Sequence, residues 1–233
     1  MIGTLINTAA VIVGSLSGLL IGRRIPARFL GFITQAIGII TLILGVQMAM
    51  KMVSVASGIS LLLALIFGGL LGEWLAIEDA FASLGRRIEN RFKFKDRDFV
   101  QGFLTASLLF CLGPMTILGS LQDGLQGDFQ LLLLKSIMDG ASSIFLAGSL
   151  GIGVLFSFIV VLVYQGGLTL LAKTLSGVFT DPVILALTIV GGALVICLGL
   201  NLLEIKKIKV ANFLPAIVFA PLFQLLFERI LPG

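Results

Sequence analysis

Two oppositely charged residues lie inside a long apolar stretch of the chain. Lys135 and Asp139 are one helical turn apart within the segment Phe129–Gly148, which is otherwise largely apolar. In a helix this spacing places both side chains on one face, close enough to form an ion pair. A charge at the centre of a membrane helix costs about 2.5–3.5 kcal/mol, so such a group usually faces a partner or a polar path. We therefore take the pair as the centre of a candidate ion or solute site.

The rest of the chain limits the chemistry available to this pair. The sequence contains no histidine, the commonest physiological proton-transfer group and metal ligand. An aspartate without histidine or thiolate neighbours is a hard oxygen ligand, suited to a proton, a sodium ion or another small hard cation. Lys135 could repel cations from the resting site, or bind an anionic substrate once Asp139 is protonated. An ion pair that only fixes helix packing is the alternative interpretation.

The remaining candidates are polar or helix-breaking residues in or beside apolar segments. Pro114 follows Gly113 and lacks an N–H, so it predicts a kink or break within its segment. Asp123 and Asp128 fall in a predicted outer loop, where they would collect cations or simply be solvated. The full candidate set for ion or substrate binding is Asp139, Lys135, Ser136, Ser142, Gly113, Pro114, Gln122, Asp123, Asp128, Gln47, Asn201 and Asn7.

These residues belong to a chain whose composition fits a polytopic membrane protein. Of its 233 residues, 58% are hydrophobic and only 12% are charged. Soluble domains carry roughly 45–50% apolar and about 25% charged residues, so a soluble protein is excluded. The only two cysteines, Cys111 and Cys197, lie within apolar runs, which excludes a disulfide scaffold.

Eight segments are long and apolar enough to cross a bilayer, which needs about 20 residues per helix. They are Ile2–Gly22, Gly31–Met50, Val53–Ala76, Phe99–Ser120, Phe129–Gly148, Leu150–Ala172, Pro182–Leu203 and Val210–Leu231. A seven-span arrangement stays open because the Gly148–Leu150 joint is tight and Pro114 interrupts the fourth segment. The predicted fold class is an all-α transmembrane bundle.

The basic residues predict the orientation of these spans. With both termini outside, the clusters around Arg23, Arg86 and Lys206 all fall on the cytoplasmic side, as the positive-inside rule requires. The hydrophilic stretch Glu78–Asp98 then forms either an amphipathic helix on the inner leaflet or a solvated connector. Acidic residues alternate with its basic ones, so nucleic-acid binding is not expected. The lipid bilayer is the partner that the sequence predicts, with a homo-oligomer as a further possibility.

The segment Gly38–Gln47 resembles Gly192–Asn201 in a way that predicts an internal repeat. Both have two glycines at the same spacing and a carboxamide two residues after the second glycine. If spans one to three repeat as spans six to eight, the second copy runs in the opposite direction. Gln47 and Asn201 would then lie at opposite membrane depths and line two gates, whereas Gln165 and similar carboxamides usually bridge helices.

The predicted organisation is a single membrane domain over residues 1–233. It comprises repeat A at 1–77, a cytoplasmic amphipathic linker at 78–98, a central polar helix pair at 99–149 and repeat B at 150–233. Inverted repeats are a common construction of secondary transporters.

Several short motifs together are similar to a known family. They are Gly3-Thr-x-x-Asn7, Gly38…Gly45-x-Gln47, Gly113-Pro114-Met, Gln122-Asp123-Gly124-Leu with Gly127-Asp128, and Lys135-Ser136 with Asp139-Gly140. This pattern resembles the YqgA/YdfK-type family of bacterial integral membrane proteins along the whole chain. The resemblance implies an inner-membrane location and no established activity.

Repeat and charge pair together predict a secondary transporter of a small ion or solute, with its site around Lys135 and Asp139. An ion channel and a non-transporting membrane scaffold or sensor are the alternatives. Hydrolase, metalloprotease and nucleotide-binding signatures are absent from the sequence, so we expect neither an enzyme nor a cofactor. Whether a metal ion binds is left open.

Overall fold

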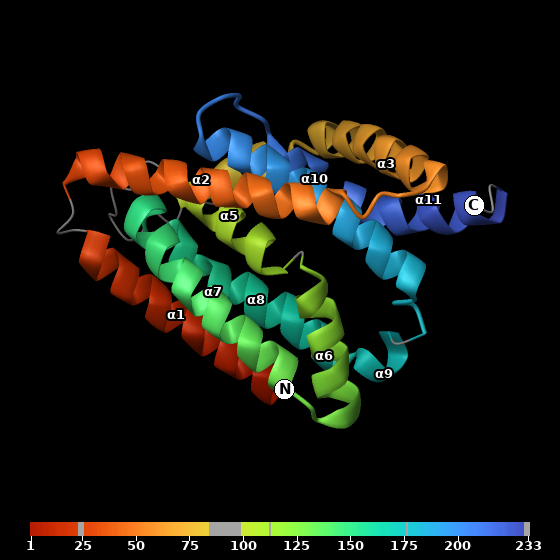
Figure 1. The fold of residues 1–233 in the computed structure, drawn as a ribbon, viewed down its shortest axis with the longest axis horizontal. Coiled ribbons are helices and arrows are strands. Elements are labelled where there is room, and N and C mark those ends of the chain that lie inside the picture. Colours follow the sequence, from red (N-terminus) through yellow and green to blue (C-terminus); the bar gives the residue numbers. More distant parts are fainter. Residues whose placement is uncertain (23–25, 84–98, 112, 176, 231–233) are drawn as a thin grey trace. The chain divides into compact units, whose positions relative to one another are not determined.

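The structure, a computed structural model, describes residues 1–22, 26–83, 99–111, 113–175 and 177–230. These residues form helices joined by turns and loops, and no strand occurs among them (Figure 1). The elements are α1 (Ile2–Gly22), α2 (Ala27–Ala49), α3 (Val55–Trp74), α5 (Phe99–Cys111), α6 (Pro114–Gln126), α7 (Gln130–Leu150), α8 (Gly153–Leu170), α9 (Ala172–Leu175), α10 (Asp181–Leu202), the 3-10 turn η1 (Val210–Phe213) and α11 (Ala216–Ile230).

The helices agree with the spans predicted from hydropathy. Seven segments among the described residues are long and apolar enough to cross a membrane. Helices α5 and α6 qualify together as an eighth span that is bent by 58°. The predicted all-α, polytopic membrane fold is therefore confirmed.

The bend between α5 and α6 arises at the predicted glycine–proline step. Helix α5 ends at Cys111, and Gly113 takes an extended conformation with φ −72° and ψ 145°. Pro114 then begins α6, where its missing N–H is harmless because the first N–H groups of a helix have no internal partner. The side chain of Thr116 returns to α5 and donates a hydrogen bond to the carbonyl oxygen of Phe110 over 2.9 Å.

The predicted outer loop around Asp123 is wrong, because α6 continues through it. The helix runs to Gln126 and ends at Gly127, whose φ of 72° lies in the left-handed region that terminates helices. Asp123 is therefore a buried helical residue and not a solvated loop acid. Asp128 alone remains exposed in the following turn, where it accepts a hydrogen bond from the Gln130 N–H.

The chain forms two compact units, each assembled from segments that are distant in sequence. The first comprises Met1–Ile37 and Gly85–Gly177, and therefore α1 with α5 to α9. The second comprises Gly38–Leu84 and Val178–Gly233, and therefore α3, α10, η1 and α11. Helix α2 contributes its first part to one unit and its second part to the other.

In the first unit α1 lies against α7 at van der Waals distance. Gly14, Gly18 and Gly22 recur along one face of α1, and a Cβ at any of them would overlap a backbone atom of α7. Glycine permits this approach because it has no Cβ, as is usual where membrane helices pack closely. These glycines on the first span thus form a helix-packing surface.

The second unit is held by an equivalent contact between α3 and α11. A Cβ at Gly68 would overlap Ala216, and one at Gly72 would overlap the backbone of Asn212. Ala64, Ala216 and Ala220 form a buried cluster with residues of α10. Small residues on both helices let the backbones meet in a region where lipid gives no hydrophobic drive for association.

Helices α2 and α10 also meet in the second unit, and their contacts are reciprocal. The glycine contacts are Gly38 with Leu203, Gly192 with Ala49, Gly45 with Ile196, and Gly199 with Leu42. The numbering shows that the two helices run antiparallel. In the predicted repeat alignment Gly38 corresponds to Gly192 and Gly45 to Gly199. Exchanging the two copies therefore turns the Gly38–Leu203 contact into Gly192–Ala49, and the Gly45–Ile196 contact into Gly199–Leu42. Reciprocity of this kind is the property of a two-fold relation.

The amphipathic helix predicted for Glu78–Asp98 lies largely outside the described residues. Residues 77–83 are helical, and residues 84–98 lie outside the part of the chain that the structure describes.

Replacement of Gly14 by alanine tests the α1–α7 contact. The added methyl group would overlap Ser143 Oγ and the Gly140 carbonyl, and overpacking of this kind costs about 1–3 kcal/mol. We expect a lower midpoint of thermal unfolding in detergent. Gly167→Ala is the matched control, because a Cβ there has no neighbour within 4 Å. Equal midpoints for Gly14→Ala and the wild type would contradict the contact.

Candidate functional site

Lys135 and Asp139 form the predicted ion pair on the buried face of α7. Lys135 Nζ donates to Asp139 Oδ2, and the two residues are only 5% and 8% exposed. At 1.5 Å per residue, Asp139 lies about 14 Å along the helix from Gln130. A bilayer core is about 30 Å thick, so this carboxylate lies near the middle of the span.

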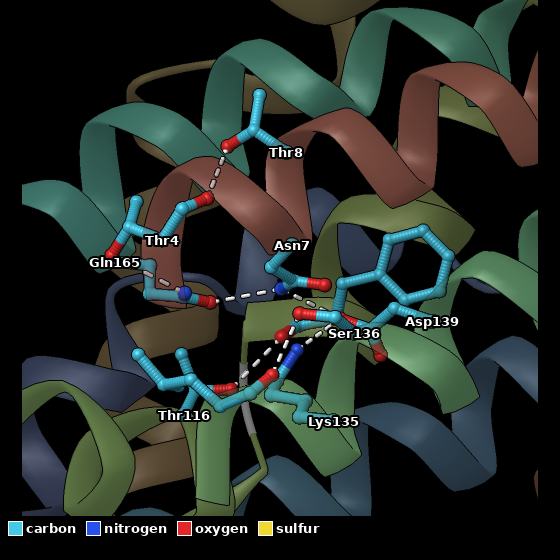
Figure 2. Close-up of polar contacts among 10 residues, drawn as sticks. Thr4, Asn7, Thr8, Thr116, Lys135, Ser136, Asp139 and Gln165 are labelled. Carbon is cyan, nitrogen blue, oxygen red and sulfur yellow. Dashed lines mark hydrogen bonds and ion pairs between the residues drawn. The ribbon is translucent and has the colours of Figure 1, made fainter. Parts of the chain in front are cut away.

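A carboxamide from α1 shares the carboxylate with Lys135. Asn7 Nδ2 donates to Asp139 Oδ2 over 3.0 Å and to Gln165 Oε1, on α8, over 2.9 Å (Figure 2). Both partners accept hydrogen bonds, so the amide nitrogen must face them and the oxygen must face away. Asn7 is fully buried, and its Oδ1 has no hydrogen-bond partner among the described residues.

The hydrogen bonds continue from Gln165 toward the N-terminal end of α1. Gln165 Nε2 donates to Thr4 Oγ1 over 3.3 Å, and Thr4 Oγ1 lies 3.2 Å from Thr169 Oγ1. The Thr169 hydroxyl donates its hydrogen to the backbone carbonyl of Gln165, so in the contact between the two threonines Thr4 is the donor and Thr169 the acceptor. We call the set Lys135, Asp139, Asn7, Gln165, Thr4 and Thr169 the polar network; α1, α7 and α8 all contribute to it.

The broken span passes beside the ion pair. Helices α5 and α6 both pack against α7, and Figure 2 shows Thr116 of α6 beside Lys135. Thr116, on the first turn of α6, closes the break by its bond to Phe110. The first turn of α6 thus lies close to the ion pair.

Additional buried hydroxyl groups in this unit have no hydrogen-bond partner within the described ranges. They belong to Ser15 on α1, Thr105 and Ser107 on α5, and Ser120 on α6. A buried polar group without a partner carries a desolvation penalty. These hydroxyls can therefore hydrogen-bond water or a polar ligand that enters the unit.

Asp123 is held separately from the polar network. Its Oδ2 accepts from the Gly3 N–H over 3.1 Å and lies 3.0 Å from the amino group of Met1. Asp123 therefore ties the end of α6 to the beginning of α1. Gly113 and Pro114 lie at the helix break, as described above.

Within the part of the chain that the structure describes, the other predicted residues make no side-chain hydrogen bond to the polar network. Ser136 donates to the carbonyl of its own helix at Leu132, and Ser142 is half-buried. Gln122 and Gln47 are exposed. The Asn201 side chain donates to the Ile208 carbonyl and accepts from the Ile208 N–H, each over 2.8 Å, so it stabilises the turn that follows α10.

The binding residues predicted from the sequence do not include Thr4, Gln165 or Thr169. Gln165 does bridge helices, as carboxamides in membrane helices usually do. The available signal was the spacing of Thr4 with Asn7 and of Gln165 with Thr169, since residues three or four apart share one helix face. Two such polar pairs in apolar helices mark two faces that can be buried against each other.

A second polar cluster joins α3 to η1 in the other unit. Asn212 donates to Glu73 Oε2 over 2.5 Å and accepts from the Glu78 N–H over 2.7 Å. Lys209 pairs with Glu73 over 2.8 Å, and this bond raises the pKa of the Lys209 ammonium. Burial raises the pKa of the Glu78 carboxyl, which accepts from the Ala211 N–H over 3.0 Å. The cluster anchors the α10–α11 turn.

No candidate metal site of three or more cysteine, aspartate or glutamate residues occurs within the described part of the chain. Asp139 and Asn7 are two hydrogen-bonded residues at the ion pair that carry side-chain oxygen atoms. They form a donor set of one carboxylate and one carboxamide.

Comparison with known proteins places the chain in a family. A family model described as "Protein of unknown function (DUF554)" matches residues 2–225. The chain belongs to the DUF554 family. Uncharacterized membrane protein YdfK of Bacillus subtilis (strain 168) is 33% identical over 222 residues, which cover 95% of this chain and 94% of the relative. Uncharacterized protein YqgA of Escherichia coli (strain K12) is 29% identical over 225 residues, with 94% of each chain covered.

These similarities confirm the resemblance seen in the sequence motifs. No solved structure matches the chain. The membrane-protein relative and the apolar helices show that this DUF554 protein is a multi-pass membrane protein in contact with the lipid bilayer.

Neutralising the ion pair of this DUF554 protein one residue at a time should destabilise it more than neutralising both residues together. Lys135→Met or Asp139→Leu leaves an unpaired buried charge, which typically costs about 3–5 kcal/mol. The double variant leaves none, so we expect its midpoint of thermal unfolding to exceed that of the lower single variant. If the midpoint of the double variant falls by the sum of the two single decreases, a direct ion pair is contradicted.

Proposed function

We propose that the protein is a secondary transporter, not an enzyme, and that it moves a small ion or solute through the site formed by Lys135 and Asp139. The observation that carries the proposal is a buried ion pair near the middle of a span. Its carboxylate also accepts from a carboxamide whose oxygen has no hydrogen-bond partner among the described residues. Intramembrane ionisable groups most often mark such pathways.

Energetics favour a functional role for the pair over a purely structural one. Buried ion pairs can often be replaced by apolar residues of similar volume without loss of stability. The α1–α7 contact is already formed by the glycines at positions 14, 18 and 22. Two charges near the bilayer midplane are therefore not needed to hold these helices together, and a polar ligand gives a reason for their presence.

The broken span supports the same proposal. Discontinuous helices supply the binding sites of many secondary transporters, because their free ends present unpaired backbone groups and a partial charge near the midplane. Here the break between Cys111 and Pro114 joins α5 and α6, which both pack against the helix that carries Lys135 and Asp139.

The predicted inverted repeat supports it as well. Helices α2 and α10 run antiparallel with reciprocal glycine contacts, as two copies of opposite direction would. Helices α1 and α8 occupy equivalent places in the two copies, and Asn7 and Gln165 join them at the polar network. Transporter sites typically lie at the interface of such copies.

The two ends of the α1–α7 pair differ in a way that suits an occluded state. Thr4 and Asp123 lie toward the N-terminal end of α1, whereas Gly14, Gly18 and Gly22 close the other end against α7. The hydrogen bonds of Gln165 and Thr4 thus extend from the ion pair toward the N-terminal end of α1. Transport requires a second state in which the glycine-lined contact opens.

We place the protein in the bacterial cytoplasmic membrane, with both termini outside. The distribution of basic residues supports this orientation. Cysteine labelling tests it. We expect Lys51→Cys to react with a membrane-impermeant maleimide in intact cells, and Lys207→Cys to react only after the cells are lysed. The unsubstituted protein reports any background from Cys111 and Cys197. The reverse labelling pattern would overturn the orientation.

Asp139→Asn tests transport directly. Proteoliposomes are offered a panel of cations, anions and small neutral solutes, and uptake is followed by tracers or an internal dye. Loss of even an outer partner of a binding site lowers activity about 10–100-fold, so loss of this carboxylate should reduce a saturable flux at least about tenfold. Asp181→Asn, an exposed aspartate in the other unit, is the matched control and should keep the wild-type rate.

Three outcomes would overturn this proposal. They are no saturable flux of any solute in the panel, an unchanged flux in Asp139→Asn, and a flux that never saturates, which would indicate a channel.

A further inference from the structure

We propose that the Lys135 ammonium holds the place of a transported monovalent cation of the sodium class, and that this cation enters in exchange for one proton released by Lys135. This inference rests on the proposed transport function and names its substrate and its coupling. The exchange follows from three features of the buried site: its occupant, its charge balance and its unused oxygen.

The site already binds a monovalent cation, the ammonium of its own lysine. Lys135 Nζ donates a hydrogen bond to Asp139 Oδ2, and the same oxygen accepts a second hydrogen bond from Asn7. Carboxylate and carboxamide oxygens are hard ligands that suit a small hard cation and disfavour soft metals. A free cation can therefore take the position of the ammonium if the lysine side chain withdraws.

Charge balance requires that a proton leaves when the cation enters. Helix α1 carries no charged side chain. The other titratable or charged residues on the helices that contact α7 are Cys111 on α5, Asp123 on α6, Tyr164 on α8 and Arg28 in the first turn of α2, a helix that meets α7 through the Thr34–Ser149 hydrogen bond. Asp123 is engaged with Gly3 and Met1, so the ion pair is neutral by itself. A second cation beside a charged Lys135 would leave a net charge in a low-dielectric site, which is strongly disfavoured.

Release of one proton from Lys135 restores neutrality. The bound ammonium becomes a neutral amine, the proton goes to water, and the cation takes its place on Asp139. The reverse step reprotonates the amine and expels the cation. Each cycle exchanges one cation for one proton, and no net charge crosses the membrane.

The amides of Asn7 and Gln165 can serve both states. With the ammonium bound, Asn7 presents its nitrogen to Asp139 and leaves Oδ1 without a partner in the described part of the chain. Rotation of this amide by half a turn places its oxygen where the nitrogen lies now, 3.0 Å from Asp139 Oδ2, as a second cation ligand. Gln165 can rotate with it, donating to Asn7 and accepting from Thr4, because an amide both donates and accepts.

Sodium-driven proton movement tests the proposal. Wild-type proteoliposomes containing a pH-sensitive dye receive external Na⁺, with K⁺ and Li⁺ in parallel. We expect the interior to become alkaline as Na⁺ enters, at a rate that does not change when the membrane potential is clamped.

Lys135→Arg is the decisive variant. Arginine keeps the positive charge and can pair with Asp139, but it does not release its proton at physiological pH. The variant should retain its fold and lose the Na⁺-driven alkalinisation. Lys51→Arg makes the same change at an exposed turn and should behave as the wild type. A Lys135→Arg protein that alkalinises at the wild-type rate would overturn the proposal.

A binding measurement on the wild type covers the case in which Lys135→Arg does not fold. One proton leaves for each Na⁺ bound, so the apparent dissociation constant for Na⁺ should fall about tenfold for each unit by which the pH is raised. It can be measured by calorimetry or thermal shift in detergent. A constant affinity across pH overturns the exchange.

Other outcomes separate this inference from the broader proposal. An Asp139-dependent flux of another solute without proton movement overturns the exchange and leaves transport standing. Absence of every flux overturns both.

Discussion

A carboxylate and an ammonium can remain inside a membrane only if their hydrogen-bonding capacity is met by the protein. In this protein the Asp139 carboxylate accepts one hydrogen bond from Lys135 on its own helix and another from Asn7 on α1. Asn7 is in turn tied to Gln165 on a third helix. Because each donor needs a defined acceptor, the pair fixes how α1, α7 and α8 are rotated about their axes.

This polar network depends on close helix packing. A hydrogen bond of 3.0 Å between Asn7 and Asp139 requires that the backbones of α1 and α7 approach closely. The glycines at positions 14, 18 and 22 allow that approach along the rest of the same helix pair. The packing surface and the polar network are therefore parts of one arrangement, in which the small residues position the polar ones.

Close helix packing through glycine also occurs in the second unit, where α2 and α10 make reciprocal contacts. Glycines at equivalent repeat positions meet the partner helix in pairs that exchange with each other. The polar network joins α1 and α8, the first helices of the two predicted copies.

The sequence by itself determined the features that depend on neighbouring residues. Hydropathy located the spans, the one-turn spacing of Lys135 and Asp139 predicted their pairing, and Pro114 predicted the break in its span. Each of these follows from local geometry, because a helix sets which side chains share a face and proline lacks an N–H.

Only the tertiary structure decided which distant segments meet. It buried Asp123 in a helix against Gly3, although Gly124 and Gly127 follow it in sequence, and it assigned Asn201 to a local turn. It also brought Asn7 to Gln165 across more than half of the chain. Apolar helices of similar composition can pack in many rotations, and the choice among them rests on contacts between faces that no local pattern specifies.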